Sequence, residues 1–200
     1  MRVLDRLADV MILNLVFVAT ALPVVTLGPA LTALNYTALK LADDDCDGVV
    51  SSYLRSFRLN FREGILVGLA SGLLVGVLGA WYIVVENLNI PELPRVLLWV
   101  VFYVVAFRFA LTLLYVFPYL ARFADPLPVV LNNSRLMSIK HLPSSLGMAA
   151  VVGLPLVITV FYPQLVGYGL LWLLLGFAGV AYVNGALLNS IFRTYAPTAP

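Results

Sequence analysis

One apolar stretch of the chain carries a small residue at every fourth position. In an α-helix these positions form a single, slowly drifting stripe along the surface. Glycine is a poor helix former in water, whereas in lipid a stripe of small residues lets a second helix approach closely. The stripe predicts a membrane helix that packs tightly, either against another span of this chain or against a partner protein. Its members are Gly64, Gly68, Gly72, Gly76 and Ala80.

The composition of the chain indicates the same environment. Of the 200 residues, 62% are hydrophobic and 11% are charged, whereas soluble domains carry about 25% charged residues. We therefore expect an all-α, polytopic membrane protein with a single integral membrane domain over residues 1–195 and a flexible tail at 196–200. The lipid bilayer is its first partner. A net charge of +2 is too small to suggest binding to nucleic acid.

Five stretches are candidates for crossing the bilayer, which takes about 20 apolar residues. The first stretch is the shortest and contains Pro23. One short helix, at 30–41, cannot cross alone, so it packs on the first span as a half-helix or lies at the membrane interface. Two further short helices are amphipathic and are expected at the interface. The predicted spans are residues 10–27, 65–85, 96–121, 145–161 and 165–188, and the short helices are residues 30–41, 50–62 and 128–141.

The positions of lysine and arginine set the expected orientation, because cytoplasmic loops of membrane proteins carry an excess of both. The two long loops between predicted spans are basic and Arg193 lies near the C-terminus, whereas the short connections hold only Arg95. We therefore expect the long loops and the C-terminus in the cytoplasm. The side on which the N-terminus lies depends on whether segment 30–41 crosses the membrane.

The sequence offers no set of residues for catalysis. One histidine, His141, and one cysteine, Cys46, leave no His/Cys cluster for a transition metal and no internal disulfide. The run 43–48 matches the opening of a calcium-binding loop, but the twelfth position is Leu54 instead of the glutamate that such a loop needs. This run is expected to be a solvated acidic turn. We predict that the protein is not an enzyme and that it has no catalytic residue, metal or cofactor.

A cation stands near the middle of one predicted span. Arg108 costs roughly 2.5–3.5 kcal/mol there on membrane-insertion scales, so it is expected to face a partner or a water-filled cavity. It binds an anionic or polyhydroxyl ligand or a lipid headgroup, or else it contacts backbone carbonyls, Asn14 or Asp9. Asn14 and Asn35 belong to a polar N-terminal hairpin that either lines a substrate path or forms hydrogen bonds between helices. The candidate intramembrane polar site is Arg108, Asn14 and Asn35.

Four stretches of the chain resemble a known family. They are LPVVTLGPALTALNYTALKL at 22–41, SYLRSFRLNFREG at 52–64, YVFPYLARF at 115–123 and LNNSRLMSIKHLPSSL at 131–146. In their order and spacing the chain is similar to the YesL-like family of bacterial multi-pass membrane proteins, a domain of unknown function. The turn Thr26–Ala30 is the most specific element. Members of that family are often encoded near carbohydrate ABC importers and glycan-degrading enzymes, so the resemblance implies a role beside sugar uptake and assigns no reaction.

Two functions remain open at this point. The first is an accessory or regulatory partner of a carbohydrate uptake system in the bacterial plasma membrane, in contact with ABC transporter subunits or with further copies of itself. The second is a small sugar or solute transporter, acting as a dimer, with a path between the N-terminal hairpin and Arg108. A continuous polar cavity that reaches Arg108 favours the transporter. Filled packing with an open groove along Gly68 and Gly72 favours the partner protein.

Overall fold

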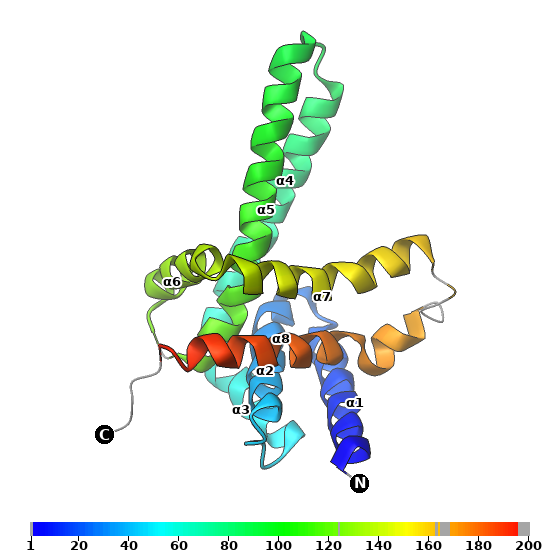
Figure 1. Ribbon diagram of the computed structural model, residues 1–200, viewed down its shortest axis with the longest axis vertical. Helices are drawn as coiled ribbons and strands as arrows, with labels where there is room; N and C mark the ends of the chain where they lie inside the picture. Colours follow the sequence, from blue (N-terminus) through cyan, green and yellow to red (C-terminus); the bar gives the residue numbers. More distant parts are fainter. Residues whose placement is uncertain (1, 124, 163, 165–168, 196–200) are drawn as a thin grey trace.

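The computed structural model describes residues 2–123, 125–162, 164 and 169–195, and within them the regular elements are all helical (Figure 1). The chain is therefore an all-α protein, as its composition predicts. Within these residues four helices are long and apolar enough to cross a membrane, judged by length and composition. The helices are α1 (Arg2–Ala21), α2 (Leu27–Ala42), α3 (Val49–Leu59), α4 (Phe61–Asn87), α5 (Glu92–Arg122), α6 (Leu127–Lys140), α7 (Leu142–Phe161) and α8 (Phe177–Phe192).

The predicted spans and short helices map onto these elements with shifted ends. Helices α4, α5 and α7 contain the spans expected at 65–85, 96–121 and 145–161, and α2 and α6 correspond to the short helices expected at 30–41 and 128–141. The described part of the span expected at 165–188 lies mostly in the continuous helix Trp172–Phe192. Residues 165–168 of that span and the tail at 196–200 lie outside the described residues.

The segment expected as the first span, residues 10–27, is divided among three elements. It runs from α1 through a 3₁₀ turn at Val24–Thr26 into the start of α2. Helix α1 is not among the four candidate spans, because charged residues occupy its first turns. The break coincides with Pro23, because proline lacks a backbone N–H donor and its ring disfavours a continuous helix. The Thr26 hydroxyl donates hydrogen bonds to the carbonyl oxygens of Thr20 (2.6 Å) and Pro23 (2.7 Å), which fixes the turn.

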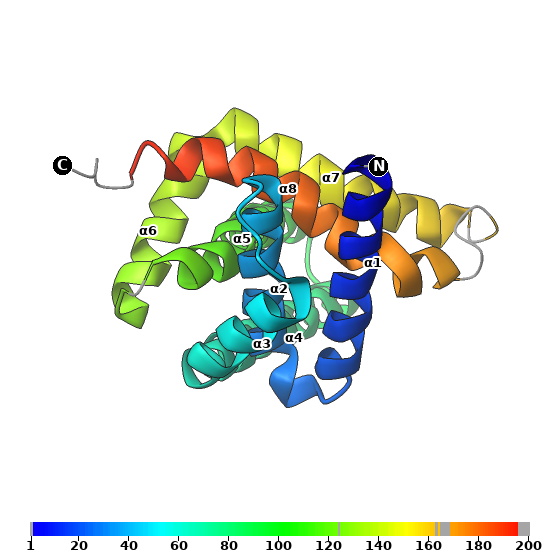
Figure 2. The ribbon, with the colours of Figure 1, turned by 90° about the horizontal axis from the view of Figure 1, so that it is seen from below.

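Helix α2 lies at the centre of the packed part of the molecule. It touches α1, α3, α4, α5 and α8, and Figure 2 shows it with α1, α3 and α8 around it. Small side chains make this possible, because Ala30, Ala33 and Ala38 are fully buried and hold neighbouring backbones close. The segment is too short to span a membrane alone, and it instead forms the core on which the other helices pack.

Helix α3 turns its apolar side to the protein. Tyr53 is fully buried, and its hydroxyl shares a hydrogen bond of 2.5 Å with the Thr20 hydroxyl of α1. Burial raises the pKa of Tyr53 to about 12, because the phenolate form is poorly solvated there. This side of α3 packs on α1 and α2, and the interfacial position expected from the sequence stays a prediction. Its arginines, Arg55 and Arg58, remain on the exposed side.

Two apolar hairpins run across each other. Figure 1 shows α4 and α5 rising along the long axis of the molecule, away from the other helices, while α7 and α8 lie across that axis, as they also do in Figure 2. The helices of both hairpins are among the four that are long and apolar enough to cross a membrane.

Candidate functional site

The first half of the small-residue stripe is a contact within the chain. Gly28 of α2 lies against the backbone of α4, where an added Cβ would overlap the carbonyl oxygen of Gly64. A Cβ on Gly64 would lie 2.7 Å from the Cα atom of Pro29, and a Cβ on Gly68 would lie 2.9 Å from the Cα atom of Gly28. Such distances are shorter than side-chain contacts allow, so this crossing requires glycine on both helices.

The second half of the stripe is open. A Cβ built on Gly72 or Gly76 meets nothing within 4 Å in the described structure, and Ala80 is exposed. The same holds for Gly79, which lies off the stripe. Along one helix the stripe therefore changes from a backbone crossing to an unoccupied face. The sequence predicted close packing but did not identify Gly28 as the residue that meets it.

Asn14 lies at a break in the last helix. The turn Trp172–Gly176 is π-helical, so its backbone bonding is irregular just before α8. The Asn14 amide donates hydrogen bonds to the carbonyl oxygens of Trp172 (2.9 Å) and Leu173 (2.7 Å). Its side-chain oxygen accepts a hydrogen bond of 2.8 Å from the backbone N–H of Ala178. This fully buried asparagine thus satisfies backbone groups at the break, which an apolar environment requires.

The three residues of the predicted polar site are not brought together. Asn35 donates a hydrogen bond of 2.8 Å to Leu31 one turn back in the same helix, and Asn14 is bound to the π-helical turn. Arg108 is half-buried, and its guanidinium makes no hydrogen bond or ion pair with any residue that the structure describes. Three cavities lie at the end of α2, between α5 and α6, and between α1 and α8, and none of them is lined by these three residues.

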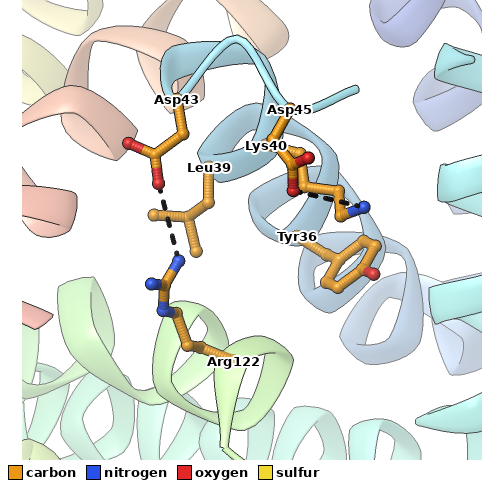
Figure 3. Close-up of a pocket in the computed structure, with 6 residues that line it drawn as sticks. All are labelled: Tyr36, Leu39, Lys40, Asp43, Asp45 and Arg122. Atoms are coloured by element: carbon orange, nitrogen blue, oxygen red, sulfur yellow. Dashed lines mark ion pairs between the residues drawn. The ribbon is translucent and has the colours of Figure 1, made fainter. Parts of the chain in front are cut away.

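A small charged cavity lies where α2 and α5 end (Figure 3). Its volume is about 170 Å³, and two ion pairs stand at its wall. The guanidinium of Arg122 lies 3.8 Å from the carboxylate of Asp43, and the ammonium of Lys40 lies 3.7 Å from the carboxylate of Asp45. The six residues that line it are Tyr36, Leu39, Lys40, Asp43, Asp45 and Arg122.

The charged cavity belongs to a tie between three helix ends. Asp43 also accepts a hydrogen bond of 2.9 Å from Arg193, which follows α8. Asn189 of α8 donates a hydrogen bond of 2.9 Å to the carbonyl oxygen of Leu39 and accepts one of 3.4 Å from Arg122. Cations at the C-terminal ends of helices are favoured by the helix dipole. The arrangement joins α2, α5 and α8.

Each of the first three acids of the calcium-like run faces a cation. Asp44 forms an ion pair with Arg6, as Asp43 does with Arg122 and Asp45 with Lys40. Among the described residues no group of three or more His, Cys, Asp or Glu side chains is placed to hold a metal ion. The sequence showed the acidic run but not its pairing, because two of the partners, Arg6 and Arg122, lie on distant segments of the chain.

The comparisons with known proteins concern the N-terminal part of the chain. Residues 10–82 match a family model described as a protein of unknown function, DUF624. The match runs from α1 through most of α4, so it includes Asn14, Tyr53 and the crossing of Gly28 with Gly64 and Gly68. A search of curated proteins and a search of solved structures each found no match.

Proposed function

We propose that the protein is a non-enzymatic integral membrane protein of the bacterial plasma membrane that acts as an accessory or regulatory partner of a carbohydrate uptake system. The class of partner follows from the family resemblance noted above. The mode of action is helix–helix contact in the membrane, and the contact region is the α4–α5 hairpin.

The observation that carries this proposal is the exposure of the hairpin. In the most apolar 18-residue window of each candidate span, 6% of the residues are buried in α5, 11% in α7 and 17% in α4, against 39% in the helix Trp172–Phe192. Apolar side chains exposed to lipid are ordinary in a membrane. Glycines on a lipid-facing surface need a further reason, because they have no side chain to pack. Gly72 and Gly76 are useful there only if another helix approaches closely.

The alternative of a transporter acting in its own right has less support. A solute path through the N-terminal hairpin to Arg108 needs a polar cavity along it. Asn14 is occupied by backbone groups of the last helix, and Arg108 lines none of the three described cavities. The polar residues of the N-terminal hairpin act in packing, which favours a protein that works through assembly.

The test is affinity purification from native membranes of cells that use the carbohydrate. Recovery of transporter subunits with the wild-type protein is the expected result, and their absence contradicts the proposal. Gly72→Leu is expected to lower that recovery by about tenfold or more, equivalent to about 1.4 kcal/mol of binding. Gly79→Leu is the matched control, because it places the same side chain in equally open space but off the stripe. Equal recovery with both variants excludes the stripe as the contact.

A further inference from the structure

Arg108 is a cation without a counter-charge. Its side chain is half-buried and has neither a hydrogen bond nor an ion pair with any residue in the described ranges. The backbone carbonyl oxygen of Arg108 accepts a hydrogen bond of 2.8 Å from the Thr112 hydroxyl, but this bond does not involve the guanidinium. A charge in an apolar span is rare and is normally paired, so the partner of Arg108 is to be sought outside the chain.

The depth of Arg108 excludes water and lipid headgroups as that partner. At 1.5 Å per residue it lies about 24 Å from Glu92, at one end of α5, and about 21 Å from Arg122, at the other. The hairpin is antiparallel, with Trp81 packed on Phe102 at 6.1 Å between ring centres, so Arg108 stands level with the middle of α4. An arginine side chain reaches about 6 Å, far less than the half-thickness of about 15 Å of the hydrocarbon.

The position of Arg108 on its helix defines where the partner lies. Leu111 and Tyr115 follow at three and seven residues, so they share its face. Leu111 is buried, and about two turns beyond Arg108 this face meets α7, where the Tyr115 hydroxyl shares a hydrogen bond of 2.8 Å with Ser145. The Tyr115–Ser145 contact marks a corner between α5 and α7, and Arg108 lies about two turns from it on the same face of α5. Helical side chains tilt toward the N-terminus, which here directs it toward the free end of the hairpin.

A second copy of the chain brings no suitable carboxylate. The acids of the hairpin, Glu63, Glu86 and Glu92, lie at the ends of α4 and α5. No Asp or Glu follows Asp125 in the sequence, so α7 and α8 have none. The acids of α1 lie in its first turns. The counter-charge at mid-membrane depth must therefore come from a different protein.

We propose that Arg108 pairs with an aspartate or glutamate in the middle of a transmembrane helix of another protein, docked in the corner between α5 and α7. This inference rests on the proposed function and specifies its partner, which is a membrane subunit with one carboxylate inside a span. In lipid the two charges neutralise each other, which makes the contact selective as well as strong, because any purely apolar helix leaves Arg108 unpaired.

The experiment measures co-purification of membrane subunits with four forms of the protein. Arg108→Leu is expected to lower recovery by about tenfold or more, while Arg108→Lys keeps most of it because it keeps the charge. Arg135→Leu is the matched control, since Arg135 is an exposed cation on α6. Arg108→Leu removes no side-chain hydrogen bond or ion pair within the described chain, so an unchanged elution profile and thermal unfolding in detergent are expected to show that it still folds.

The decisive step is charge exchange. In a recovered subunit, the mid-span Asp or Glu is changed to Arg and combined with Arg108→Asp. Each single change is expected to abolish recovery, and the pair is expected to restore it. Full recovery with Arg108→Leu, or a recovered subunit without a mid-span acid, overturns this inference and leaves the proposed function standing if Gly72→Leu still lowers recovery. Failure of the wild-type protein to recover any transporter subunit contradicts both.

Discussion

The two halves of α4 carry the same four-residue repeat and have opposite surroundings. In the first half, Gly64 and Gly68 meet the backbone at Gly28, and any side chain there collides with α2. In the second half, Gly72 and Gly76 face open space. A stripe of small residues therefore indicates that another helix can approach closely, but it does not identify that helix. The first half is explained by the fold of this chain, and only the second is available for a partner.

The largest expected effect comes from a substitution that blocks the contact between α2 and the first half of α4. Gly28→Leu places a side chain where the Gly64 carbonyl oxygen lies, so α2 and α4 must separate. Overpacking of this kind costs about 3 kcal/mol or more. We expect loss of the folded, monodisperse protein in detergent. Gly72→Leu is the matched control and is expected to unfold at the wild-type temperature, because nothing lies within 4 Å of its added Cβ. Equal losses in both variants contradict the division of the helix.

A smaller effect is expected at the buried asparagine that joins α1 to the last helix. Asn14→Leu keeps the volume but leaves the backbone groups at Trp172, Leu173 and Ala178 without their partner. Unpaired buried polar groups cost about 1–3 kcal/mol each, so we expect a loss of about 3 kcal/mol in unfolding free energy. Asn87→Leu is the control on the hairpin, where Asn87 bonds one turn back to Ile83 and is exposed. An Asn14→Leu variant that is as stable as the wild-type protein contradicts the role assigned to Asn14.

A third comparison uses two tyrosines and alkaline pH. The folded-state pKa of Tyr53 is raised to about 12 from 10.0, so its contribution is complete below pH 10 and is lost as the pH rises from 10 toward 12. Tyr53→Phe is expected to cost about 1 kcal/mol at pH 7, through the lost hydrogen bond to Thr20. It is also expected to unfold with a weaker decline above pH 10. Tyr103→Phe, exposed on the hairpin, is the control and is expected to leave the stability at pH 7 unchanged. If the stability of Tyr53→Phe declines above pH 10 as steeply as that of the wild-type protein, the raised pKa of Tyr53 is not the cause of the decline.

The sequence predicted the features that depend on the residues of a single helix. The apolar runs predicted α4, α5 and α7, and the small-residue repeat predicted close packing somewhere along α4. What it did not reveal was pairing between distant segments. The sequence placed Gly28 in a turn before the helix expected at 30–41, and nothing in that turn points to Gly64. The backbone groups that Asn14 binds become free only because the last helix has a π-helical turn, which no local pattern marks.

The acidic run at the end of α2 shows the same limit. Its spacing resembles a calcium loop, but each of its first three carboxylates faces a cation from another segment or from the preceding turn. Charges of opposite sign far apart in sequence leave no trace of their pairing in a single chain. Arg122 and Arg193 served in the sequence only to orient the protein, and the structure gives both a place in the tie between helix ends.

The smallest effect is expected for that tie. Asp43 is one-fifth exposed and pairs with Arg122 and Arg193, and partly exposed ion pairs contribute about 1 kcal/mol or less. Asp43→Asn keeps the shape and removes the charge, so we expect a loss of about 0.5–1 kcal/mol in unfolding free energy that shrinks at high salt. Glu86→Gln, at the exposed end of the hairpin, is the control and is expected to cost nothing measurable. A salt-independent loss at Asp43 would assign its role to packing instead of charge.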